Sequence, residues 1–121
     1  MADAPRVAVV VPNLFLRWPV ETAIRAVGAQ PIFLTAVSDA ATARCSVLIA
    51  DLDALGGDAA GALRAVAAAD ITVLAFGAHV ERERLAAARA AGAVALPRSI
   101  FLAKLPELLE SAVRSRPRDA D

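Results

Sequence analysis

Few residues of this chain could do chemistry, and Asp51 is the most informative of them. It ends an apolar run, residues 46–51, that is typical of a buried central strand with a carboxylate at its C-terminal tip. In parallel α/β sheets, binding and catalytic groups gather at the carboxyl ends of the strands. Asp53 adds a second carboxylate two positions later. Its place just after the strand favours a loop or turn residue over a ligand.

Other polar side chains follow other apolar runs and could face the same cleft as Asp51. His79, the only histidine, comes just after residues 71–76, while Asn13 and Arg98 follow the first and last runs. A histidine there is compatible with pH sensing or anion binding. The simpler interpretation is a residue at a helix N-terminus that meets solvent. Together Asn13, His79 and Arg98 are the candidate residues of a small anionic-ligand sensor.

Several other kinds of site are excluded by what the sequence lacks. Cys45 is the only cysteine, so the chain has no internal disulfide and no cysteine zinc cluster. No Gly-x-Gly-x-x-Gly or Gly-Lys-Ser/Thr loop is present, which argues against dinucleotides and nucleoside triphosphates. The serines have no adjacent base that could activate them as nucleophiles. We therefore expect no metal site and no resident cofactor.

The composition favours one cytoplasmic domain. A length of 121 residues suits a single domain, residues 1–121, with an ordered core of about 5–114 and a flexible polar tail at 115–121. The formal net charge is zero, which gives no electrostatic argument for binding nucleic acid or an anionic membrane. No apolar run approaches the roughly 20 residues of a membrane span. The single cysteine fits a reducing cytosol.

Short apolar runs alternate with helical patterns along the whole chain. Strands are expected at 6–11, 31–35, 46–51, 71–76 and 93–96, and helices at 14–27, 58–69 and 81–91. Gly28 and Gly92 are the expected helix stops. Ser38 is expected to cap a short helix at 38–44; Ser99 is expected to cap a turn at 100–105, before a last helix that begins near Pro106. Crossovers of this length predict parallel strands with helices on both faces.

This order of elements resembles the receiver domain of two-component response regulators over nearly the whole chain. Residues 46–51 resemble the strand that carries the phospho-accepting aspartate. Ala90-Ala-Gly-Ala93 followed by Leu96-Pro-Arg98 resembles the helix end and the strand that bears a lysine, and residues 14–17 resemble the start of the first helix. The resemblance implies a three-layer, flavodoxin-like (βα)5 fold whose parallel sheet has the strand order 2-1-3-4-5.

Most of the chemistry of that family is replaced here. The family's acidic pair falls on Pro12 and Asn13, and its hydroxyl residue after strand four falls on Ala75. Its lysine falls on Arg98, and the proline after that lysine falls on Ser99. Only the aspartate is retained, as Asp51. Because Mg²⁺ is usually held by carboxylates together with phosphate oxygens and waters, we expect its binding to be weak and phosphotransfer to be slow or absent. Arg98 is expected to pair with the unmodified Asp51.

The leading hypothesis is a stand-alone pseudo-receiver in bacterial signalling that is not an enzyme and acts through protein–protein contacts. In receivers the usual contact surface is built from the fourth helix, fifth strand and fifth helix. Its counterpart here, for a protein partner or a second copy, is expected to use Arg84, Ala88, Ala91, Leu102, Lys104, Leu105 and Leu109. Two alternatives stay open: an atypical response regulator phosphorylated on Asp51, and the anion sensor of Asn13, His79 and Arg98.

Overall fold

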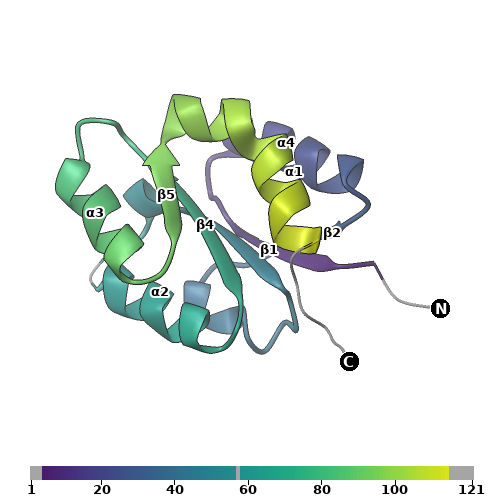
Figure 1. The fold of residues 1–121 in the computed structure, drawn as a ribbon, viewed down its shortest axis with the longest axis horizontal. Coiled ribbons are helices and arrows are strands. Elements are labelled where there is room, and N and C mark those ends of the chain that lie inside the picture. Colours follow the sequence, from purple (N-terminus) through teal and green to yellow (C-terminus); the bar gives the residue numbers. More distant parts are fainter. Residues whose placement is uncertain (1–3, 57, 115–121) are drawn as a thin grey trace.

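The computed structural model describes residues 4–56 and 58–114, which form a parallel sheet of five strands between two layers of helices (Figure 1). The strands are β1 (Arg6–Val10), β2 (Gln30–Phe33), β3 (Val47–Asp51), β4 (Thr72–Gly77) and β5 (Val94–Pro97). Their order is β2-β1-β3-β4-β5, and every neighbouring pair is parallel. The expected α/β fold with strand order 2-1-3-4-5 is therefore confirmed.

The helices are divided between the two faces of the sheet (Figure 1). The first and last helices, α1 (Leu14–Ala26) and α4 (Arg98–Arg114), cover one face. The other face is covered by α2 (Ala59–Ala68) and α3 (Arg82–Ala90), together with the short 3-10 turn η1 (Val37–Asp39). A second 3-10 turn, η2 (Leu52–Ala54), directly follows β3 and so places its residues at the tip of the central strand.

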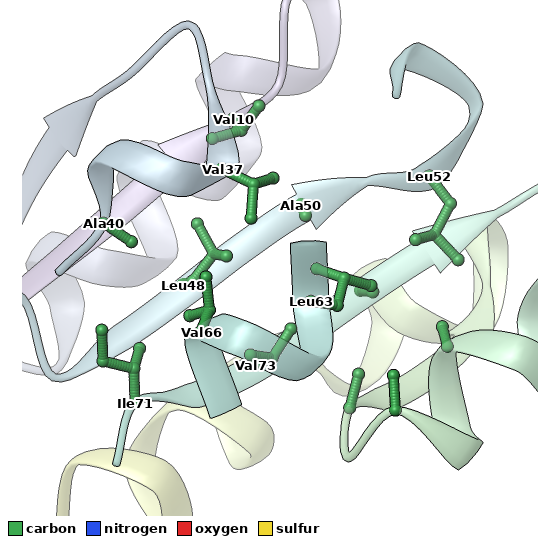
Figure 2. Close-up of a cluster of buried hydrophobic side chains, with 14 of the residues drawn as sticks. Val10, Val37, Ala40, Leu48, Ala50, Leu52, Leu63, Val66, Ile71 and Val73 are labelled. Atoms are coloured by element: carbon green, nitrogen blue, oxygen red, sulfur yellow. The ribbon is translucent and has the colours of Figure 1, made fainter. Parts of the chain in front are cut away.

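The alternation of side chains along β3 divides the core into two clusters. Val47 and Ile49 pack with α1 and α4, whereas Leu48 and Ala50 point to the opposite cluster. Figure 2 shows this second cluster, to which β3 contributes Leu48 and Ala50 and α2 contributes Leu63 and Val66. A strand covered on both faces needs apolar residues at every position, which is why the run before Asp51 is continuous and does not alternate with polar residues.

The helix stops are confirmed, whereas two expected helix starts are wrong. Gly28 and Gly92 follow α1 and α3 with φ angles of 80° and 105°, which favour glycine. Ser38 does not cap a helix, because η1 begins one residue earlier and Ala36 occupies its N-cap position without a side-chain hydrogen bond. Residues 40–44 then form turns instead of continuing the helix.

The last helix begins earlier than expected. Residues 100–105 are not a separate turn, because α4 runs without a break from Arg98 and holds Pro106 in its interior. Ser99 therefore lies inside the first turn and is not its cap. An interior proline costs about 3 kcal/mol. Burial of Leu105 and Leu109, one on each side of that position, offsets the cost at about 1.5–3 kcal/mol for each side chain.

Two expectations about the limits of the chain stay predictions. The flexible tail at residues 115–121 lies outside the described residues, and so do the first three residues of the chain. The prediction that residues 1–121 form a single domain is likewise not tested. Among the described residues, no helix has the length and apolar character needed to cross a membrane.

Candidate functional site

Asp51 is the buried charged residue of the part of the chain that the structure describes. It ends β3, is only 5% exposed, and accepts a hydrogen bond on Oδ1 from the backbone N–H of Asp53 at 3.0 Å. Burial raises the pKa of the Asp51 carboxyl above its ordinary value, and the negative charge of Asp53 raises it further. The hydrogen bonds from the backbone of Asp53 and Ala54, with the positive charge of Arg98, oppose this rise in pKa.

Asp53, in η2, is the point where the charges of the strand tips converge. Its Oδ2 accepts hydrogen bonds from the backbone N–H of Ala78 at 3.0 Å and from Nη2 of Arg98 at 3.1 Å. Its Oδ1 accepts one from Nη1 of Arg84 at 2.8 Å. These donors come from the loop after β4, from α4 and from α3. We call Asp53, Ala78, Arg84 and Arg98 the strand-tip cluster.

The strand-tip cluster corrects two expectations. Arg98 pairs with Asp53 and not with Asp51. Asp53 is more than a turn residue, because its carboxylate joins three segments that are far apart in the sequence. The reason lies in solvation: the side chains of Arg98 and Asp53 are 42% and 27% exposed, so their ion pair forms without complete loss of water. A pair with the buried Asp51 would carry a much larger desolvation cost.

The expected hydroxyl position was also misplaced. Ala75 lies inside β4, fully buried, and pairs with Ala50 on one side and Ala95 on the other. The strand ends at Gly77, where an added Cβ would lie 3.5 Å from Oδ1 of Asp53. Gly77 has no hydroxyl either. The tip of β4 therefore contributes the backbone N–H of Ala78 to Asp53 in place of a side-chain group.

The residues at the acidic-pair positions lie at the start of α1. The side-chain oxygen of Asn13 accepts a hydrogen bond from the backbone N–H of Phe15 at 2.9 Å, so it caps the helix. Pro12 is exposed and has no side-chain ligand atom. Within residues 4–56 and 58–114, no three His, Cys, Asp or Glu side chains are grouped so that they could hold a metal ion.

The three residues of the sensor hypothesis are only partly brought together. His79, Ser99 and Arg98 line a depression of about 380 Å³ with Ala78, Pro97 and Leu102. Asn13 is not part of that lining. The Arg98 guanidinium that would bind an anion there already contacts Asp53. The geometry therefore gives the sensor hypothesis no support.

The expected contact face, on α3, β5 and α4, is mostly core. Ala88, Ala91, Leu105 and Leu109 are all buried, and only Arg84, Leu102 and Lys104 of that set reach the surface. The buried residues form the apolar stripes by which α3 and α4 pack on the sheet. They are therefore not available to a partner.

The exposed large apolar side chains that sequence reasoning missed lie at the start of α1. Leu14 and Phe15 are exposed there together with Trp18. The run from Leu14 to Leu16 is apolar at every position, so helical periodicity alone does not say which of its side chains faces water.

Comparisons with known proteins identify the fold. No family model and no curated protein matches the sequence. A response regulator of Thermotoga maritima matches 93% of this chain and 100% of its own with a TM-score of 0.75 at 21% identity. A response regulator receiver protein of Pseudomonas putida gives 0.72 at 21% identity, covering 92% and 99% of the two chains. HP1043, an orphan response regulator of H. pylori, gives 0.62 at 15%, covering 87% and 96%. At these identities the likeness establishes the receiver fold.

The buried carboxyl of Asp51 predicts a specific pH dependence. Because its pKa is raised in the folded protein, protonation favours folding, and this contribution is lost as pH rises through the folded-state pKa. Asp51→Asn keeps the acceptor for the Asp53 N–H but removes the buried charge. We expect it to stabilise the domain at pH 7 and to remove the loss of stability that ionisation of Asp51 causes as pH rises.

Urea denaturation between pH 3 and pH 8 measures this effect, with Asp39→Asn, which neutralises an exposed carboxylate, as the matched control. A destabilised Asp51→Asn protein at pH 7 would mean that the charge of Asp51 is compensated in the fold.

Proposed function

We propose that this chain is a cytoplasmic pseudo-receiver: a regulatory module of bacterial signalling that acts through protein–protein contacts, without efficient phosphotransfer and without enzymatic turnover. The receiver fold, shared with bacterial response regulators, supports a signalling role. The observation that carries the proposal is the strand-tip cluster, in which Asp53 already binds Arg98 and Arg84.

Arg98 stands at the position of the family's lysine, which contacts the acyl phosphate in an active receiver. Catalysis of phosphoryl transfer depends mainly on positioning and on neutralising the charge of the phosphoryl group. Here Nη2 of Arg98 lies 3.1 Å from a carboxylate oxygen of Asp53. A phosphoryl group on Asp51 would have to compete with that carboxylate for the cation. The charge of Asp53 would also repel it, as it already raises the pKa of Asp51.

The residues at the strand tips also fit Mg²⁺ poorly. This ion requires near-octahedral oxygen ligands and is usually bound by one or two carboxylates together with phosphate oxygens and waters. Asp51 is buried, and both oxygens of Asp53 accept hydrogen bonds from cationic groups. Asn13 is used as a helix cap. A divalent cation at Asp53 would therefore have to displace two arginines, and we expect its binding to be weak.

Titration with Mg²⁺ and beryllofluoride, which mimics a phosphoryl group on aspartate, distinguishes the pseudo-receiver from the alternative. That alternative is an atypical response regulator phosphorylated on Asp51. We expect the amide NMR signals of residues 51–54 and 77–80 to stay unchanged at millimolar reagent. Saturable shifts in these signals that are absent in Asp51→Asn would overturn the pseudo-receiver. An active receiver carried through the same titration checks the reagents.

A further inference from the structure

An apolar patch at the start of α1 is unused by the core and by the strand-tip cluster. Leu14, Phe15 and Trp18 are 71%, 90% and 57% exposed; we call them the α1 patch. Aromatic side chains offer about 150–250 Å² each, so the two aromatic residues alone present on the order of 250 Å² of apolar surface. With Leu14 this approaches the largest patch that a typical monomer exposes, and such patches mark interaction sites.

The α1 patch borders a groove between α1 and α4, the two helices that lie on the same face of the sheet in Figure 1. The groove measures about 720 Å³, and its lining runs along α1 from Leu14 to Ala26 and along α4 from Leu102 to Pro106. Thr22 is the one polar side chain in that lining. The groove therefore fits an apolar occupant.

The spacing along α1 indicates which occupant fits. Phe15, Trp18, Thr22 and Ala26 follow one another by three or four residues and so share one face of the helix. The large side chains stand at the N-terminal end of this face and the small ones at the C-terminal end. A second α1 helix running antiparallel would set Phe15 against Ala26 and Trp18 against Thr22 of the other copy.

We propose that this face binds a second copy of the chain as a two-fold symmetric dimer, with α1 antiparallel to α1 and the α1 patch of each copy seated in the groove of the other. A two-fold interface uses the same surface on both subunits, so the surface must complement itself. A projecting aromatic at one end of α1 and small residues at the other meet that requirement.

The charges on the chain are compatible with self-association. The net charge is zero, so two copies do not repel each other at long range. Glu21 and Arg25, on the same helix, form an ion pair of 2.9 Å within one copy and bring no uncompensated charge to the interface. The residues outside the described ranges include one large apolar side chain, Met1, and so do not supply an apolar segment for the groove.

The size of the face predicts the strength of the dimer. A stable interface buries about 800 Å² on each partner, and the exposed apolar surface of the α1 patch is smaller than that. We therefore expect a dimer with a dissociation constant of about micromolar or weaker. The α1 patch shares no residue with Asp51 or with the strand-tip cluster, so sedimentation and the beryllofluoride titration report on different residues.

Sedimentation equilibrium from about 1 µM to about 1 mM tests the proposal. The average mass of the wild-type chain should rise toward twice the monomer mass, and emission of Trp18, the only tryptophan, should shift to the blue in parallel. Phe15→Asp should weaken association at least about tenfold. An acidic residue in the first turn of a helix is favourable, so this variant should stay folded. Val80→Asp, at an exposed apolar residue elsewhere, is the matched control.

Cysteine cross-linking tests the antiparallel arrangement. The variant with both Phe15→Cys and Ala26→Cys should form intermolecular disulfides between residue 15 of one copy and residue 26 of the other, while Phe15→Cys alone should not. Cys45 is buried and so does not compete. The proposal is overturned if the wild-type chain stays monomeric to the highest concentration, or if Val80→Asp, and not Phe15→Asp, abolishes association. Cross-linking by Phe15→Cys alone would overturn the antiparallel arrangement.

Discussion

Asp53→Ala is expected to destabilise the domain by about 2 kcal/mol and to separate the loops at the strand tips. Hydrogen bonds to charged groups contribute about 1.5–3 kcal/mol each, a figure that partial exposure reduces. Removing the carboxylate leaves Arg84, Arg98 and the N–H of Ala78 without their shared acceptor. The Nε of Arg98 is buried and has no hydrogen-bond partner in the described structure, so this guanidinium depends strongly on Asp53.

Urea denaturation and hydrogen exchange measure the two effects of Asp53→Ala. We expect faster exchange at residues 78–84, whose backbone the strand-tip cluster holds. The pKa of Asp51 should also fall, because the charge of Asp53 contributes to its rise. Glu81→Ala is the matched control: Glu81 lies 3.7 Å from Arg84 in an exposed pair and should contribute less than about 0.5 kcal/mol. Equal losses of unfolding free energy in both variants would mean that the strand-tip cluster contributes no more than ordinary surface ion pairs.

The sheet was predictable because its determinants are local. Continuous apolar runs mark strands that are covered on both faces, and a glycine after each of two helices marks where the chain must turn. Gly28 and Gly92 adopt the positive φ angles expected of such positions. The strand order came from the resemblance to receivers, which depends on the succession of these elements and not on any catalytic residue.

The partner of Arg98 could not be predicted in this way. Asp51 and Asp53 are two residues apart at the same tip, and the sequence does not say which of them a side chain from residue 98 reaches. The turn η2 decides this, because it directs the Asp53 carboxylate toward the N–H of Ala78 while Asp51 stays buried. That outcome depends on the solvation of two carboxylates, which apolar periodicity does not report.

Four residues of the expected contact face are buried for a different reason. Ala88 and Leu105 belong to amphipathic stripes, and such a stripe packs on the sheet before it can serve a partner. The same apolar side chains cannot both pack on the sheet and contact a partner. The exposure of Phe15 and Leu14 could not be recognised from the sequence, because their neighbours are also apolar. It depends on how α1 is oriented relative to α4.

Phe101→Ala should have the largest effect on stability, about 3–5 kcal/mol. Phe101 is fully buried, and its ring centroid lies 5.0 Å from that of Phe76 with an interplanar angle of 41°. The alanine leaves a cavity between β4 and α4 that the sheet cannot close. Phe33→Ala is the control at a surface aromatic that stacks with Arg17, where about 1 kcal/mol or less is at stake. Urea denaturation of both variants gives the comparison.

The ring pair of Phe76 and Phe101 also supports the strand-tip cluster, so substitutions in the ring pair and in the cluster should be energetically coupled. Phe76 comes two residues before Ala78, and Phe101 comes three residues after Arg98, so the ring pair holds together the segments that supply two of the donors to Asp53. In a double-mutant cycle of Phe101→Leu with Asp53→Ala, we expect an interaction energy of more than about 0.5 kcal/mol. Additive losses would mean that α4 positions Arg98 without help from the aromatic pair, and that the charges at the strand tips and the core beneath them are independent.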